Sequence, residues 1–184
     1  MREVLGKRIG LRDISHMRSM AADDNIRAKL FALINDTDDR VGYNALWIFT
    51  HFNSDELQWL IPRRNYLIDY LLAANHIGKQ RLILTLLDRM PTDKDDLRTD
   101  YLDFCLSRIN STLPYGIRAL CLKQAFAQCR HYPELMQELR GEIEMMDRNE
   151  LSPGVASARR QVLRKIARIE VRCTKTDNRR AVIH

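Results

Sequence analysis

The stretch VGYNALWIF, residues 41–49, decides the fold because its apolar spacing returns three more times along the chain. Shifts of 38, 38 and 41 residues give four equivalent rows: Val41-Ala45-Phe49, Lys79-Ile83-Leu87, Ile117-Cys121-Ala125 and Ala158-Val162-Ile166. Within each row the residues are four apart, which places them on one face of a helix. Self-similarity at such a period is typical of repeat proteins, whose units bury their apolar faces by stacking.

The segments between these rows repeat as well, so each repeat is a pair of helices. Leu30 and Leu33 fall on Ile68 and Leu71, and then on Leu106 and Ile109. The pattern predicts an N-terminal capping helix over 11–20, a short helical turn over 55–60 and about four pairs. The pairs are expected at 25–34 with 38–52, 63–74 with 77–89, 94–109 with 114–130, and 133–148 with 153–169.

Helix start signals agree with these boundaries. Ser54 precedes an acidic pair, and Thr92 stands three residues before Asp95, as in a capping box. Ser152-Pro153 offers a cap with proline at the first helical position. No sustained alternation of apolar and polar residues indicates a strand. The predicted fold class is therefore all-α, an α-α superhelix.

These residues resemble a known family. DDRVGYNA, residues 38–45, resembles the opening of the second helix in HEAT and armadillo-like repeats, and residues 117–121 and 158–162 resemble the same motif. The resemblance covers roughly residues 25–169 and implies about four HEAT-like pairs in a single domain, 1–170, with a capping segment over 1–24. The chain departs from the motif at Gly42 and Gln80, where arginine is usual, and at Lys79, where an apolar residue is usual.

The formal net charge of +6 is concentrated at the two ends of the chain. Residues 158–184 hold nine Lys or Arg against two acids, and residues 1–20 hold five against two. Residues 171–184 are predicted to form a basic, flexible tail. Basic ends can bind nucleic acid or an acidic partner. They can equally be a solvated helix and its frayed end.

In solenoids of the resembled family the second helices line the concave, binding side. The repeat register then gives two rows of outward positions, Gly42, Gln80, Arg118, Arg159 and Trp47, Thr85, Lys123, Arg164. The predicted partner-binding residues are Trp47, Gln80, Arg118, Lys123, Arg159 and Arg164. The structural alternative is that the arginine row forms an internal polar ladder between repeats and that the lysine row is merely solvated.

Signatures of enzymes and cofactor sites are missing from the sequence. There is no Gly-rich phosphate loop, no GxSxG and no HExxH. The histidines and cysteines lack metal-ligand spacing, so neither a metal nor a cofactor is predicted. Cys105, Cys121 and Cys129 are expected to be small buried hydrophobes. No secretion signal or membrane-spanning run is recognised. The four cysteines lack the density and spacing of a disulfide scaffold, which favours a reducing cytoplasm.

Two functions from different classes remain. The first is a non-enzymatic scaffold that holds a protein or acidic peptide along its concave face. The alternative is nucleic-acid binding, with or without base-excision chemistry, as the resemblance extends to HEAT-like alkylpurine DNA glycosylases, which bind DNA in a basic groove. Enzymatic activity is left open by the sequence, with its absence favoured. None of their functional residues matches this chain position by position.

Overall fold

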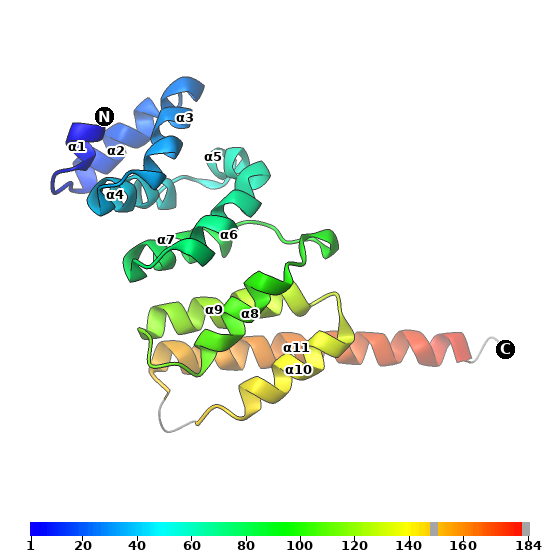
Figure 1. Cartoon of the computed structure of the whole chain (residues 1–184). Coiled ribbons are helices and arrows are strands. Elements are labelled where there is room, and N and C mark those ends of the chain that lie inside the picture. The colour runs from blue at the N-terminus through cyan, green and yellow to red at the C-terminus, as the bar shows by residue number, and fades with distance from the viewer. Residues whose placement is uncertain (148–150, 182–184) are drawn as a thin grey trace. The chain divides into compact units, whose positions relative to one another are not determined.

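The computed structural model describes residues 1–147 and 151–181, with side chains up to residue 171. Every regular element in these residues is a helix, so the predicted all-α class is confirmed. The chain divides into two compact units, Met1–Met90 and Pro91–His184 (Figure 1). Each unit is described separately, and the predicted organisation of residues 1–170 as one domain stays a prediction.

The first unit contains a capping segment and two helical pairs. Its elements are α1 (Arg2–Leu5), α2 (Leu11–Met20), α3 (Asp24–Ala32), η1 (Leu33–Asn35), α4 (Asp39–Thr50), α5 (Ser54–Leu57), η2 (Gln58–Arg63), α6 (Arg64–Ala73) and α7 (Ile77–Leu87). Helix α4 contacts α1, α2, η1 and α7, and α6 contacts α7. The second helices of the two pairs, α4 and α7, therefore lie side by side. The short helix α1 is the one element of this unit that the periodicity did not indicate.

The second unit contains the other two pairs. Its elements are η3 (Lys94–Asp96), α8 (Thr99–Ile109), α9 (Tyr115–Cys129), α10 (Pro133–Glu144) and α11 (Pro153–Ala181). Helix α9 packs against α8, α10 and α11, and α10 packs against α11. Helix α11 continues beyond residue 169, where the sequence placed its end. The flexibility predicted for residues 171–184 stays a prediction.

The repeated apolar rows form the core of both units. Every member of the four rows is buried, and Lys79 is the single polar one among them. Its Nζ lies 2.7 Å from Asp39 Oδ1, so α7 is tied to the start of α4. Burial alone would lower the pKa of the Lys79 ammonium, but hydrogen bonds to Asp39 and Tyr70 outweigh it and raise that pKa.

Gly42 creates the space for this lysine. A Cβ at residue 42 would lie 2.6 Å from the Ile34 carbonyl oxygen and 3.0 Å from Lys79 Nζ. Both separations are too short for van der Waals contact, so α4 approaches its neighbours this closely because residue 42 has no side chain.

Two of the predicted caps are one residue out of register. The N-cap of α5 is Asn53, whose Oδ1 accepts from Glu56 N at 2.9 Å while Glu56 Oε2 accepts from Asn53 N at 2.6 Å. The box before η3 is formed by Asp93 with Asp96. In both places the prediction chose a hydroxyl residue, whereas an Asn or Asp next to it has the better-placed acceptor. Thr92 is instead buried.

Candidate partner-binding surface

The first row of candidate residues binds the carbonyl ends of preceding helices. Each polar side chain of this row reaches from a second helix to the last turn, or the residue just beyond it, of the first helix in its own pair. The bonds are Gln80 Nε2 to Ala74 O at 2.6 Å, Arg118 Nε to Ile109 O at 2.9 Å, and Arg159 Nε to Ile143 O at 3.0 Å. Carbonyls at a helix end lack the usual donor four residues further on, so these side chains supply one. At Ile143 the arginine adds to a backbone bond, since Ile143 O also accepts from Met146 N at 3.4 Å.

In the first pair, the carbonyl at the end of the first helix has a different donor. Gly42 has no side chain to offer, and the Ile34 carbonyl accepts from the Tyr70 hydroxyl of α6 at 2.7 Å. The structural alternative considered for this row was a ladder between repeats. The bonds of Gln80, Arg118 and Arg159 instead run within pairs.

Burial separates the members of this row. Gln80 is 5% and Arg159 is 7% exposed, and both are packed between helices with a carbonyl partner. Side chains so enclosed offer a partner little surface. Arg118 is half-buried and is the member of the row that opens onto a pocket.

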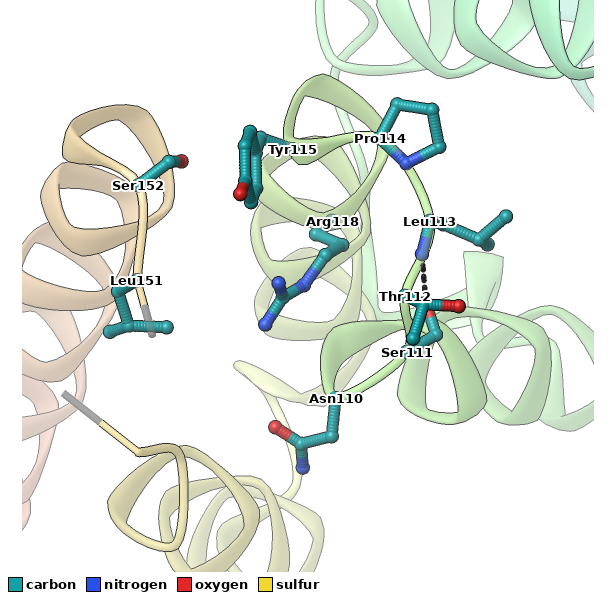
Figure 2. A pocket seen from close by; sticks show the side chains of 9 residues that line it. All are labelled: Asn110, Ser111, Thr112, Leu113, Pro114, Tyr115, Arg118, Leu151 and Ser152. Atoms are coloured by element: carbon teal, nitrogen blue, oxygen red, sulfur yellow. Dashed lines mark hydrogen bonds between the residues drawn. The ribbon is translucent and has the colours of Figure 1, made fainter. Parts of the chain in front are cut away.

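The pocket around Arg118 lies where the α8–α9 loop meets the start of α11, and its volume is about 840 Å³. The guanidinium group is directed into it, with Tyr115 and Ser152 above and Asn110 below in the view of Figure 2. The lining residues are Asn110, Ser111, Thr112, Leu113, Pro114, Tyr115, Arg118, Leu151 and Ser152. Among these described residues Arg118 alone carries a charge, and hydroxyl and amide groups supply the remaining polarity. The arrangement suits an anionic group.

The loop that shapes this pocket is held by its own hydrogen bonds. Ser111 Oγ donates to Arg108 O at 2.8 Å and accepts from Leu113 N at 3.3 Å. Because Arg118 Nε is bonded to Ile109 O, the orientation of the guanidinium is restrained without a ligand. A fixed cation loses less conformational entropy on binding than a freely rotating one.

The second row lies closer to solvent. Arg164 is exposed, whereas Trp47 and Lys123 are half-buried. Lys123 and Arg164 occupy equivalent repeat positions on α9 and α11, which pack against each other. Exposed cations surround Arg164 on α11, namely Arg160, Lys165 and Arg168. The second unit therefore presents a basic surface on its second helices.

Trp47 belongs to a group of rings that the sequence did not single out. The Tyr43 ring centroid lies 6.4 Å and the His51 centroid 6.0 Å from that of Trp47. Tyr43, Trp47 and His51 follow one another at intervals of four along and just past α4. That spacing was a detectable signal, because side chains four apart are neighbours on a helix.

The cysteines serve packing, as expected. Cys105, Cys121 and Cys129 are buried free thiols. Burial raises the pKa of Cys105, and burial followed by the charge of Glu138 raises the pKa of Cys129 to about 12. Within the described residues no group of three His, Cys, Asp or Glu could hold a metal ion. The side chain of Cys173 lies outside the described residues.

Comparison with known proteins relates the chain to a family of repeat proteins. A family profile described as a HEAT repeat domain matches residues 1–166, which include most of both units. Nothing among the curated proteins or the solved structures matches the chain. In the part of the chain that the structure describes, no helix is long and apolar enough to cross a membrane.

Proposed function

Because the chain belongs to the HEAT repeat domain family, whose helical scaffolds generally mediate protein interactions, we propose that it is a non-enzymatic scaffold for an acidic protein partner. The proposed contacts are the outward faces of the second helices, with Arg118, Lys123 and Arg164 in the second unit and Trp47 in the first. The sequence also suggested Gln80 and Arg159 as partner-binding residues. In this proposal they instead hold the two helices of their own pairs together, because both are buried and bonded to carbonyls.

The pocket around Arg118 is the observation that carries the proposal. With Nε bonded to Ile109 O, the two terminal amino groups of the guanidinium form the edge that enters the pocket. Such an edge can donate two parallel hydrogen bonds to a carboxylate, the strongest pairing between arginine and an acidic side chain. Lys123 and Arg164 extend the positive surface along α9 and α11. The free thiols of this unit support a cytoplasmic location.

Nucleic-acid binding is the second candidate, and one observation favours it. Arg160, Arg164 and Arg168 are exposed at intervals of four along α11, so their Cα atoms rise by about 6 Å from one to the next. A line of cations of one sign can neutralise successive phosphates, and such binding weakens steeply as the salt concentration rises.

The test is affinity capture from lysate with and without nuclease treatment, followed by mass spectrometry, with three versions of the protein. In the triple variant Arg118→Gln, Lys123→Glu, Arg164→Glu, glutamine can still bond the Ile109 carbonyl, as Gln80 bonds Ala74. The matched control is Arg159→Gln, which changes the same chemistry at a buried position. We expect the control to retain the wild-type partners and the triple variant to lose them.

Two outcomes would contradict the scaffold function. If the triple variant captures the same proteins as wild type, the surface is misassigned. If nuclease treatment removes all captured material, and a labelled oligonucleotide binds with a steep salt dependence, nucleic acid is the ligand.

A further inference from the structure

A second pocket lies in the first unit, on the outward face of α4, and its volume is about 550 Å³. It is lined by Lys7, Arg8, Ile9, Arg40, Tyr43, Asn44 and Trp47. We refer to it as the α4 pocket. Of these residues only Trp47 was a candidate from the sequence. The others come together because the loop between α1 and α2 crosses α4.

A buried asparagine fixes this loop against the helix. Asn44 is 5% exposed, and its Nδ2 donates to Leu5 O at 2.7 Å and to Lys7 O at 3.1 Å. Ile9 is buried on the same side. Lys7 and Arg8 are therefore carried by a backbone anchored to α4, although their own side chains are exposed.

The rim of the α4 pocket is positive. Lys7, Arg8 and Arg40 are exposed, and no lining residue is acidic. The nearby carboxylates of Asp36 and Asp39 are engaged elsewhere, with Arg2 at 2.6 Å and with Lys79 at 2.7 Å. Lys7 does pair with Glu3 at 3.1 Å, but both side chains are largely exposed, and such a pair is weak.

The rings in the pocket distinguish between possible ligands. The two rings that line it, those of Tyr43 and Trp47, are inclined to each other by 48°. Rings inclined in this way do not present one continuous flat face to successive stacked bases. Aromatic side chains, by contrast, pair readily in edge-to-face arrangements.

We propose that the α4 pocket binds an aromatic side chain flanked by carboxylates in a protein partner. The aromatic side chain packs against Tyr43 and Trp47, and the flanking carboxylates pair with Arg8, Arg40 and Lys7. This inference rests on the proposed scaffold function and gives the first unit a defined type of recognition sequence. Trp, Tyr and Arg, which dominate binding energy at protein interfaces, meet in this pocket.

The test is selection of a phage-displayed library of random dodecapeptides on the full-length protein. We expect enrichment of peptides with Phe, Tyr or Trp next to two or more Asp or Glu. The affinity of one enriched peptide, labelled with fluorescein, is then measured by anisotropy. Arg8→Glu with Arg40→Glu should lower this affinity by at least about tenfold, because rim attraction becomes repulsion. These exposed positions can change without disturbing the core.

Two matched variants complete the design. Lys29→Glu reverses an exposed charge on α3 outside the pocket and should leave the affinity unchanged. Trp47→Ala should lower it by about tenfold or more, the usual loss at an aromatic hot spot. Its fold is verified by circular dichroism.

Each outcome has a separate meaning for the two proposals. If enriched peptides lack aromatic or acidic residues, or bind the Arg8→Glu, Arg40→Glu variant as tightly as wild type, the α4 pocket assignment is wrong. If that peptide binding is lost only in the variant of Arg118, Lys123 and Arg164, the scaffold function stands and this inference falls. If no peptide is enriched but oligo(dT) binds and is released by Arg40→Glu, both proposals fail.

Discussion

Gly42→Ala offers the sharpest test of the packing between α4 and its neighbours. In the middle of a helix, alanine ordinarily stabilises by about 1 kcal/mol relative to glycine. At residue 42 the new Cβ would meet the Ile34 carbonyl oxygen at 2.6 Å and Lys79 Nζ at 3.0 Å. The first of these atoms belongs to the backbone and cannot swing aside, so α4 must move away from η1.

The expected change in the free energy of unfolding is the difference between these two effects. Overpacking of a tight site costs typically about 1–3 kcal/mol, and displacement of Lys79 from Asp39 adds to this cost. After subtraction of the gain in helix propensity, we expect Gly42→Ala to lower the free energy of unfolding by about 1–2 kcal/mol.

The matched control is Gly141→Ala in α10. A Cβ there would meet nothing within 4 Å, so propensity acts alone and should raise the free energy of unfolding by up to about 1 kcal/mol. The two substitutions are chemically identical and should have opposite signs.

Urea denaturation gives both values. Both tryptophans, Trp47 and Trp59, lie in the first unit, so their fluorescence reports its unfolding, while far-UV circular dichroism follows the helices of both units. If Gly42→Ala is as stable as wild type or more stable, the close approach of α4 to the Ile34 carbonyl is refuted.

Three further results are expected. In a Cys173→Ser variant the remaining thiols should react with Ellman's reagent only after denaturation, because they are buried and the pKa of Cys129 is raised to about 12; rapid reaction of a native thiol would contradict this. Asn44→Ala should cost about 1–3 kcal/mol and expose the loop over 6–10 to trypsin, since two carbonyls lose their donor; unchanged digestion would show that other contacts hold the loop. The hydrogen bond from Lys79 lowers the pKa of Asp39. The contribution of this carboxylate to the free energy of unfolding is therefore complete above the ordinary carboxyl pKa of 3.8, and it is lost as the pH falls through the lower pKa of the folded state. Stability of Asp39→Asn should therefore vary less with pH below about 4 than that of wild type, and equal slopes in acid denaturation would refute the pairing.

Most of the fold could be predicted because the repeat recurs so regularly. The rows that begin at Val41, Lys79, Ile117 and Ala158 place each second helix within a few residues of its observed start. Two of the three departures from the family pattern, Gly42 and Lys79, looked like independent irregularities in the sequence. In the structure they form one feature, since the missing side chain makes room for the buried ammonium group. Periodicity relates equivalent positions of different repeats, so it does not predict contacts between non-equivalent positions.

The candidate surface was harder to predict for the same reason. The register placed Gln80, Arg118 and Arg159 in one row correctly, but burial differs among them because each pair closes around its side chain to a different extent. The α4 pocket depends on where the loop with Lys7 and Arg8 runs, and this is set by Asn44, a polar residue inside a helix. Periodicity does not predict the position of such a loop, because that position depends on the hydrogen bonds from Asn44.

The bond from Arg118 to the Ile109 carbonyl makes one side chain serve two purposes. Its Nε closes the junction between α8 and α9, and its outer edge faces the pocket. A carboxylate held at that edge would restrict the arginine further and, through the shared guanidinium plane, restrain the end of α8. Binding of a carboxylate in the pocket would then slow amide hydrogen exchange at Asn110 and Ser111, the residues at the junction between α8 and α9.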